Sequence, residues 1–274
     1  MNVAMLDVQP RTALITGASA GLGAAIALEM AARGWKIAIG ARRMDRLAET
    51  AEKVRGQGAA EVYAGALDVS DDASVERFFA ASENALGIAD VIVNNAGASR
   101  FHWLEETDTR WLREEIETNL IGPILVTHRA LTPLLASGAD GDVVMVSSDA
   151  VNRPRPGQLA YGASKAGLEN YAGALGMALE GTGIRVMKVR LGPAISEFSV
   201  TWDLTAETMQ KRTDHWASFG LRDARMLAEG RLGLLTPDDV AREVVHAVTQ
   251  PRHVLLDTIE LQPAVPHKNR EQST

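Results

Sequence analysis

A tyrosine and a lysine four residues apart, Tyr161 and Lys165, carry the chemistry that this sequence most clearly suggests. The segment from Tyr161 to Glu180 is rich in Ala, Leu and Met and contains no proline, which is typical of a helix. Side chains at i and i+4 lie one turn apart on the same helix face, so the phenol and the ammonium project side by side. We expect Lys165 to favour the phenolate and to lower the pKa of Tyr161 from its ordinary value of about 10, which would make it a usable general acid or base.

A serine thirteen positions upstream, Ser148, fits the same chemistry. Its hydroxyl could hydrogen-bond the reacting oxygen that Tyr161 protonates or deprotonates. A Tyr-x-x-x-Lys pattern alone is weak, because a surface tyrosine packed on a lysine stem has the same spacing. The pattern therefore gains weight only if other parts of the chain agree with it.

A glycine-rich turn near the N-terminus gives the first agreement. A short apolar strand, 11–16, runs into Thr16-Gly-Ala-Ser-Ala-Gly-Leu-Gly23, and an apolar helix follows and ends at Gly34. This order places backbone N–H groups and the positive end of a helix at a pyrophosphate, and the glycines allow the close approach. An ordinary turn between a strand and a helix is the alternative. The residues of this turn expected to bind a dinucleotide are Gly17, Ser19, Gly21, Leu22 and Gly23.

Two arginines follow the second expected strand, 35–40, and indicate which dinucleotide is bound. A protein of this architecture that prefers NAD has an acidic residue there, for the ribose 2′-hydroxyl. Here the chain reads Gly40-Ala-Arg-Arg43, without a carboxylate. A guanidinium matches a phosphate bidentately, so Arg42 and Arg43 favour a 2′-phosphate and hence NADP(H) over NAD(H). A solvated arginine pair at a helix start is the alternative.

Strands and helices alternate along most of the chain, which predicts an α/β fold with a doubly wound parallel sheet flanked by helices. The segments flagged above follow strand ends, where ligands bind in such sheets. The further expected strands are 61–67, 90–93, 142–146, 183–190 and 254–259. The further expected helices are one ending near 55, one from 72 to 86, and 105–118, 119–137, 161–180 and 237–249.

Composition limits the classes of function. Hydrophobic residues make up 46% of the 274 residues, so a large core can form in a single domain spanning 1–274. The net charge of −7 argues against nucleic acid or an anionic membrane as a partner. Cysteine is absent and the six histidines are scattered, so we expect no metal site. With no secretion signal and no unbroken apolar run long enough to span a bilayer, a cytoplasmic protein is expected.

Residues 196–235 interrupt the alternation of strands and helices. Aromatic and Met side chains are interleaved with charge there, including Phe198 and Trp202. The segment is either additional core or a lid over the substrate, and we favour the lid because it follows the end of a strand.

Several further motifs appear in the order typical of one family, and the chain resembles the short-chain dehydrogenase/reductase family over about residues 10–260. Thr16–Gly23 matches its glycine motif, Asp68-Val69 its adenine contact, and Asn94-Asn-Ala-Gly97 its next sheet motif. Asn119, at the start of the 119–137 helix, corresponds to its catalytic asparagine. Ser148, Tyr161 and Lys165 correspond to its serine, tyrosine and lysine.

The resemblance implies a single-domain Rossmann-type fold and hydride transfer between a nicotinamide and a carbonyl or secondary alcohol, with Tyr161 moving the proton. It also implies cofactor contacts at Asn95, Ala96, Gly97, Tyr161 and Lys165, and symmetric association as a homodimer or homotetramer through the helices of Asn119 and Tyr161. The chain departs from the family after the sixth strand. Gly192-Pro193 replaces the usual Pro-Gly, and Ser196 replaces a threonine that contacts the carboxamide.

Two other functions keep the fold but differ in chemistry. A non-catalytic NADP(H)-binding redox sensor would bind the dinucleotide without turnover, and such relatives typically lose the tyrosine or the lysine. A sugar-nucleotide epimerase or dehydratase would need a larger C-terminal region. We favour an NADP(H)-dependent oxidoreductase acting on a small apolar carbonyl or alcohol. The residues expected near the substrate, from position alone, are Ser99, His102, Asp149, Val151, Gly157, Phe198 and Trp202.

Overall fold

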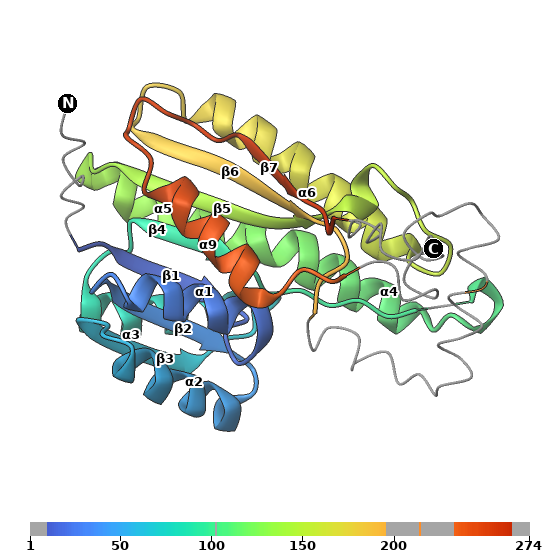
Figure 1. Cartoon of the computed structure of the whole chain (residues 1–274), viewed down its shortest axis with the longest axis horizontal. Coiled ribbons are helices and arrows are strands. Elements are labelled where there is room, and N and C mark those ends of the chain that lie inside the picture. The colour runs from blue at the N-terminus through green and yellow to red at the C-terminus, as the bar shows by residue number, and fades with distance from the viewer. Residues whose placement is uncertain (1–9, 102, 196–213, 215–232, 265–274) are drawn as a thin grey trace, which may run out of the picture.

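The computed structural model describes residues 10–101, 103–195, 214 and 233–264, and these form one parallel sheet with helices on both faces (Figure 1). The seven strands lie in the order β3-β2-β1-β4-β5-β6-β7, and every neighbouring pair is parallel. The strands are β1 (Thr12–Thr16), β2 (Lys36–Ala41), β3 (Glu61–Ala66), β4 (Val91–Asn94), β5 (Gly141–Ser148), β6 (Ile184–Leu191) and β7 (Thr258–Leu261). The predicted fold class is confirmed.

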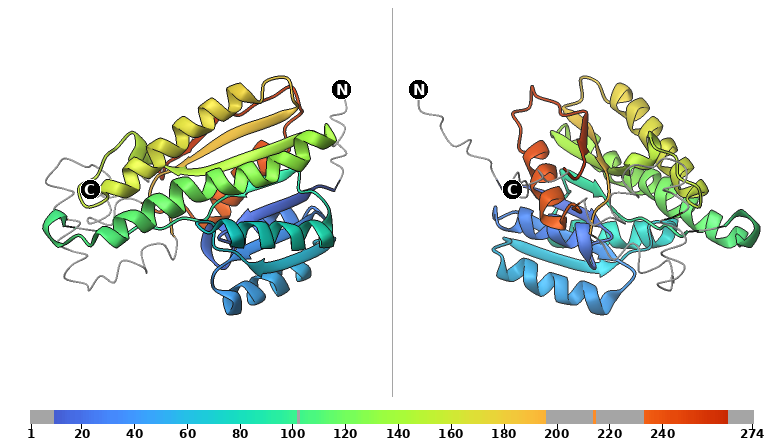
Figure 2. Two further views of the ribbon diagram at one scale, coloured as in Figure 1. Left: turned by 180° about the vertical axis from the view of Figure 1, so that it is seen from behind. Right: turned by 45° about the vertical axis from the view of Figure 1, so that its right-hand side comes forward.

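The helices divide between the two faces of the sheet, and each face has its own apolar core. Helices α1 (Gly21–Ala31), α2 (Met44–Gly56) and α9 (Pro237–Val248) cover one face. Helices α3 (Asp72–Leu86), α5 (Gly122–Ser137) and α6 (Leu159–Ala178) cover the other, which Figure 2 shows from behind. The central strands read as nearly continuous apolar runs because both of their sides are covered, and all eight residues of β5 are buried.

The helix that carries Asn119 differs from the prediction of two helices at 105–118 and 119–137. A short 3-10 turn, η1 (Leu104–Glu106), comes first, and Asp108 then caps α4 (Thr109–Ile116) by accepting a hydrogen bond from the Arg110 N–H at 2.8 Å. Helix α4 continues into α5 through a π-helical turn, η2 (Glu117–Ile121). Asn119 therefore lies inside a continuous helical stretch and does not begin a helix. In the sequence, both the polar 105–108 segment and Asn119 resemble helix boundaries. Only the 105–108 segment is a boundary in the structure.

The last strand also differs from the predicted 254–259. Strand β7 begins at Thr258, which pairs with Lys188 of β6. The carbonyl of Val254 instead accepts a hydrogen bond from the Arg185 guanidinium at 2.6 Å. The Val254 carbonyl is thus bonded to a side chain, and the chain joins the sheet at Thr258, four residues after the predicted start.

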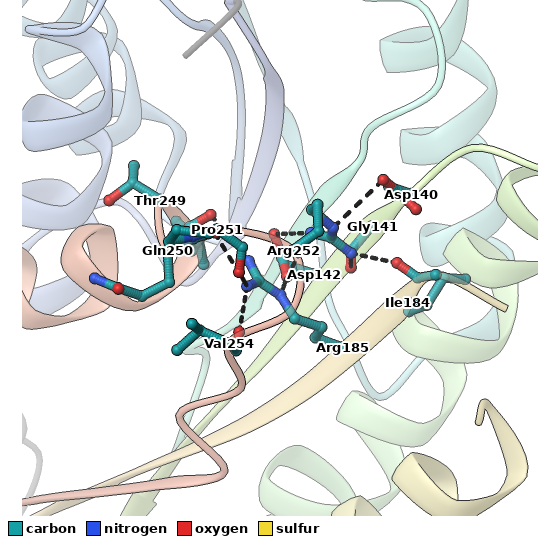
Figure 3. Close-up of polar contacts among 12 residues, drawn as sticks. Asp140, Gly141, Asp142, Ile184, Arg185, Thr249, Gln250, Pro251, Arg252 and Val254 are labelled. Carbon is teal, nitrogen blue, oxygen red and sulfur yellow. Dashed lines mark hydrogen bonds and ion pairs between the residues drawn. The ribbon is translucent and has the colours of Figure 1, made fainter. Parts of the chain in front are cut away.

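The same arginine belongs to a group of charges at the amino ends of the strands, which we call the Asp142 cluster: Asp142, Arg11, Arg185 and Arg252. Figure 3 shows Asp142 with Arg185 and Arg252. The Asp142 carboxylate is fully buried and accepts from Arg11 Nη1 at 2.5 Å, Arg185 Nε at 2.7 Å and Arg252 Nη1 at 3.1 Å. Arg185 also donates to the carbonyls of Gln250 and Pro251. The cluster thereby ties β1, β5 and β6 to the segment that follows α9.

Within the described part of the chain, one helical stretch is long and apolar enough to cross a membrane by length and composition, namely Thr109–Ser137 with a mean hydropathy of 1.2. Its apolar side chains Val126, Ala130 and Leu134 lie in the core beneath the sheet. Of the apolar window in this stretch, 39% is buried inside the structure.

Candidate active site

The glycine turn between β1 and α1 is packed directly against the end of β4. Gly17 has a φ of 68°, and a Cβ built on it would lie 2.7 Å from the Ala96 Cα. A Cβ on Gly23 would lie 2.5 Å from Asn95 Nδ2. Side chains at these two positions would separate the two segments, so glycine is required at both.

Polar bonds from Thr16 and Asn95 join these segments. Asn95 Nδ2 donates to the carbonyls of Thr16 at 2.9 Å and Gly17 at 3.2 Å. The Thr16 hydroxyl accepts from the backbone N–H groups of Asn95 at 3.1 Å and Ala96 at 3.0 Å. Gly97 is exposed beside them. Asn95, Ala96 and Gly97 thus lie against the glycine turn. Sequence reasoning did not assign Thr16 its role of bonding these residues, although its position at the end of β1 could have indicated it.

The basic residues after β2 reach the same turn. Arg43 donates to the Ser19 hydroxyl from Nε at 3.2 Å and from Nη2 at 3.0 Å. The side chain of Arg42 is 58% exposed, with Glu114 of α4 at 3.8 Å. Gly21, Leu22 and Gly23 form the first turn of α1. Within the described residues no side chain caps that first turn, and it contains no acidic residue. Arg43 therefore lies at the same turn as the uncapped N–H groups of α1.

Asp68 and Val69 follow β3, the strand next to β2, which Arg42 follows. The Asp68 carboxylate accepts from the backbone N–H of Ser70 at 3.1 Å and from the Ser70 hydroxyl at 2.6 Å. Val69 is buried, and its side chain fills the space that a Cβ on Gly122 would take. Asp68 fixes the turn and Val69 packs it against the start of α5, so both residues lie at the carboxyl edge as predicted.

Tyr161 and Lys165 face the same strand end. Tyr161 shares a side-chain hydrogen bond with Ser148, the last residue of β5. Lys165 Nζ donates to the carbonyl of Val146 at 2.8 Å, two residues earlier on that strand. Both side chains are buried, with 8% and 5% of their surface exposed. Helix α6 therefore presents the phenol and the ammonium together, on one side, to the end of β5.

The electrostatics of this pair differ from the sequence-based expectation. Burial raises the pKa of Tyr161 to about 12, against the opposing effect of the Ser148 hydrogen bond. Burial also lowers the pKa of Lys165 to about 8, with Glu169 acting in the opposite direction. The prediction of a lowered Tyr161 pKa is wrong for the protein alone, because desolvation of the phenolate outweighs the Ser148 hydrogen bond and the charge of Arg155. The shifts still mark both groups as unusual, and perturbed titratable groups concentrate at functional sites.

Asn119 lies next to this pair and clamps the loop that follows β4. Its Oδ1 accepts from the Ala98 N–H at 2.7 Å, and its Nδ2 donates to the Ala98 carbonyl at 2.7 Å and to the Ser164 hydroxyl at 3.1 Å. Ser164 in turn donates to the Tyr161 carbonyl at 2.7 Å. The side chain of Asn119 is fully buried and joins the loop to α6.

Two carboxylates near the pair, Glu169 and Glu115, were missed by sequence reasoning, and the predicted Asp149 has a partner that was not foreseen. The Asp149 carboxylate accepts two bonds from the Arg155 guanidinium, at 2.8 and 2.7 Å, so the two residues form an ion pair. Glu169, one turn beyond Lys165, accepts from Ser147 at 2.7 Å. Glu115 is buried on α4. The sequence could have indicated this burial, because Glu115 lies four residues from both Trp111 and Asn119. It therefore shares a helix face with them.

The remaining predicted residues are placed only in part. Ser99 is buried and accepts a long bond from Gln158 Nε2 at 3.5 Å, and Gly157 lies against the Phe101 ring. Gly192 donates to the Leu261 carbonyl at 2.8 Å, and Pro193 accepts from Leu235 at 3.0 Å. The predictions for four residues fall outside the described part of the chain: His102, Ser196, Phe198 and Trp202.

The predicted lid, 196–235, also lies almost entirely outside the described residues. Ile195, which precedes the segment, donates to the carbonyl of its last residue, Leu235, at 2.8 Å. Residues 195 and 235 therefore lie together just beyond the carboxyl end of β6. Val151 lies in the 3-10 turn η3 (Asp149–Val151), which follows β5.

Comparison with known proteins agrees with this geometry. A family profile described as short chain dehydrogenase matches residues 11–206. The chain is 33% identical over 252 residues to sulfoacetaldehyde reductase 2 of Chromohalobacter salexigens, covering 91% of this chain and 93% of that one.

Solved structures show the same similarity. An alcohol dehydrogenase from the archaeon Thermococcus sibiricus, complexed with 5-hydroxy-NADP, superposes with a TM-score of 0.77 at 28% identity, covering 95% of this chain and 99% of that one. A closed form of serine dehydrogenase complexed with NADP+ gives a TM-score of 0.76 at 27% identity, covering 96% and 98%. With the family profile spanning most of the chain, the protein belongs to the short-chain dehydrogenase/reductase family of oxidoreductases.

Proposed function

We propose that this protein is an NADP(H)-dependent oxidoreductase that interconverts a carbonyl compound and its alcohol, with Tyr161 as the general acid and base. The observation that carries the proposal is the Ser148–Tyr161 hydrogen bond at the end of β5, with the buried Lys165 ammonium on the same side. Bound NADPH would supply a hydride to the carbonyl carbon. Tyr161 would give its proton to the carbonyl oxygen, so that the carbonyl compound becomes an alcohol. In the opposite direction the phenolate accepts that proton.

The residues present fit NADP(H). The uncapped first turn of α1 offers N–H groups and the positive end of a helix for a pyrophosphate. Arg43, held against Ser19, and the exposed Arg42 offer bidentate donors for a 2′-phosphate. The two structural relatives named above were solved with NADP or a derivative of it, which supports the same choice of cofactor.

Lys165 can hold the cofactor without leaving its present position. An ammonium has three donors, and one of them goes to the Val146 carbonyl. Two donors remain for ribose hydroxyls of the nicotinamide half. Its positive charge beside the phenol would also favour the phenolate once both groups surround the substrate, which is the electrostatic contribution expected of a preorganised site.

Ser148 serves as the hydrogen-bond partner of the reacting oxygen. Its hydroxyl accepts from the Ala150 N–H at 3.2 Å and shares a bond with Tyr161, so its position is fixed by the turn after β5. A substrate oxygen placed between the two hydroxyl groups would be bound by both. Asn119 contributes by fixing the loop at Ala98 and the backbone of α6 through Ser164.

Two kinds of substrate are to be compared. The sequence favours a small apolar carbonyl or alcohol, whereas two relatives are named for small polar compounds, sulfoacetaldehyde and serine. A panel should therefore pair apolar ketones with polar and anionic aldehydes, and with 3-hydroxy amino acids in the oxidative direction.

The experiment uses the full chain and follows the absorbance of reduced nicotinamide with each member of the panel. Tyr161→Phe should abolish turnover while NADPH binding, measured by calorimetry, stays within a few-fold of the parent. Tyr171→Phe is the matched control, since Tyr171 lies on the same helix and packs against the core beneath the sheet. Turnover retained by Tyr161→Phe would reject the role given to Tyr161. Tight NADPH binding without turnover on any compound would favour a redox sensor instead.

We also propose that the chain associates with copies of itself through α5 and α6. Exposed apolar side chains on these helices support this, including Leu135 at 42% and Met177 at 74% exposed. Light scattering coupled to size exclusion should give a dimer or tetramer, and a monomer at micromolar concentration would contradict it.

A further inference from the structure

Glu115 of α4 is a buried carboxylate that contacts two parts of the proposed site. Only 1% of its surface is exposed. Its Oε1 accepts a hydrogen bond from the Arg100 backbone N–H at 2.5 Å, and the carboxylate also accepts from the backbone N–H of Tyr161. One side chain thus touches the loop after β4 and the helix that carries the general acid.

The Tyr161 N–H belongs to the first turn of α6, where backbone N–H groups lack acceptors within the helix. In the described residues α6 has no side-chain cap at Gln158 and no acidic residue in its first turn. Glu115 supplies an anion to that helix end from a neighbouring helix, which is electrostatically favourable. The position of Tyr161 is therefore partly set by a residue on α4.

Glu115 and Asn119 form two parallel connections between the loop and α6. Asn119, four residues later, binds Ala98 and reaches α6 through Ser164, while Glu115 binds Arg100 and reaches α6 at Tyr161. Both side chains project from the same face of the helical stretch Thr109–Ser137.

The charges around Glu115 come from three elements. On the loop, the Arg100 guanidinium pairs with Glu114 at 3.3 Å and lies over the Trp111 ring. On α4 itself, the Glu114 carboxylate is the neighbouring anion. Burial raises the pKa of Glu115 to about 7, with the Arg100 and Tyr161 N–H groups acting in the opposite direction.

The third element is α6, where the ionised Glu115 raises the pKa of the Tyr161 phenol. Asp149 acts in the same direction and Arg155 in the opposite one. Lys165, one turn further along α6, is the nearest buried cation on that helix.

We propose that Glu115 is a positioning residue, which holds the Tyr161 backbone to the 98–100 loop and whose charge acts on the Tyr161 side chain. Its effect on turnover rests on the proposed function. Its effect on the environment of Tyr161 does not, and the two can be measured separately.

The experiment is carbon-13 NMR of the full chain labelled at the tyrosine Cζ. The sequence contains three tyrosines, Tyr63, Tyr161 and Tyr171, so the Tyr161 signal can be assigned with Tyr161→Phe. In the parent protein we expect the Tyr161 signal to shift with a midpoint near pH 7, as Glu115 ionises. The Tyr63 and Tyr171 signals should show no such transition. A flat Tyr161 signal between pH 5.5 and 8.5 in the parent protein would overturn the proposal without any variant.

Three variants identify the group that titrates. Glu115→Gln keeps the shape of the side chain and should remove the transition. Glu114→Gln changes the adjacent carboxylate and should leave it, and His102→Gln tests the histidine nearest in sequence to Arg100 and should also leave it. A transition that persists in Glu115→Gln, or that disappears in either control, would contradict the assignment.

The same variants separate this proposal from the proposed function. If a carbonyl substrate is turned over, Glu115→Gln should remove a step near pH 7 from the profile of kcat/KM, and Glu114→Gln should keep that step. If no compound is turned over but the NMR transition follows Glu115, the proposed reaction fails and the positioning role stands. If turnover is found with no transition in the Tyr161 signal, the reaction stands and the positioning role fails.

Discussion

Strand β5 begins and ends in a buried polar group, and the two groups are built in opposite ways. At its amino end the Asp142 carboxylate accepts from three guanidinium groups, which also donate to several backbone carbonyls. Figure 3 shows two of them, Arg185 and Arg252. At its carboxyl end Ser148, Tyr161 and Lys165 are also buried. There the lysine donates to the Val146 carbonyl, and the Tyr161 phenol shares a hydrogen bond with the Ser148 hydroxyl.

This difference distinguishes buried polar residues that stabilise the fold from those that could take part in a reaction. A buried charge with several opposite charges and hydrogen bonds is compensated, and its removal leaves the partners uncompensated. A buried titratable group without such compensation has a shifted pKa, and the fold bears the free-energy cost. The following changes test that contrast, from the largest expected effect to the smallest.

Asp142→Asn should destabilise the fold by about 3 to 5 kcal/mol, because it leaves three arginines without their buried anion. Urea unfolding followed by circular dichroism measures this loss. A loss below about 1 kcal/mol would show that the Asp142 cluster is not what holds the amino edge of the sheet.

Lys165→Met should have the opposite sign and raise stability at pH 7. The drop of the Lys165 pKa from an ordinary 10.5 to about 8 corresponds to about 3 kcal/mol of unfavourable burial, which is an upper limit for the gain. The same unfolding experiment measures it. A variant less stable than the parent would mean that the ammonium is well compensated after all.

The stability advantage of Lys165→Met should depend on pH. Between pH 8 and 10.5 the unfolded parent chain binds a proton at Lys165 that the folded chain does not, so the stability of the parent rises with pH in that window. The advantage should therefore be largest below pH 8 and shrink toward pH 10. A difference that is constant from pH 7 to pH 10 would place the Lys165 pKa at its ordinary value.

Arg43→Ala should weaken NADPH binding by about ten- to a hundred-fold, the usual effect of losing hydrogen bonds to a charged group. NADH binding serves as the internal control and should change little. Arg42→Asp should narrow or reverse the preference in the same calorimetric assay. Equal affinity of the parent protein for the two cofactors would overturn the assignment of both arginines.

Asp140→Asn should have the smallest effect, below about 1 kcal/mol, and is the control for Asp142→Asn. The Asp140 carboxylate also faces Arg252, at 3.4 Å, but 60% of its side chain is exposed. A loss as large as that of Asp142→Asn would show that the number of charges, rather than their burial, determines stability at this edge.

The sequence predicted the sheet and the location of the site because both depend on local patterns. Apolar runs separated by helices determine the parallel sheet, and the spacing of Tyr161 and Lys165 determines that both face β5. Prediction failed where a distant side chain decides the outcome. Val254 was predicted in a strand, but its carbonyl accepts from the side chain of Arg185, which lies 69 positions away in sequence. Local sequence patterns do not show such a contact.

The Tyr161 pKa was predicted in the wrong direction for a related reason. Sequence spacing showed the lysine one turn away, whereas the extent of burial and the charges of Asp149, Arg155 and Glu115 depend on the packing of other elements. The continuous helix through Asn119 was missed because its π turn, Glu117–Ile121, has no sequence pattern of its own.

The most direct test of the contrast between the two ends of β5 is turnover per folded molecule, measured for Lys165→Met and Asp142→Asn on a carbonyl compound that the parent protein reduces. We predict that Lys165→Met loses at least about a hundred-fold in turnover, the scale of one electrostatic contribution to a transition state, while it melts at or above the parent. Asp142→Asn should melt lower and keep the turnover of the parent at temperatures where it is folded. Parent-like turnover by Lys165→Met, or an inactive but folded Asp142→Asn, would contradict the account.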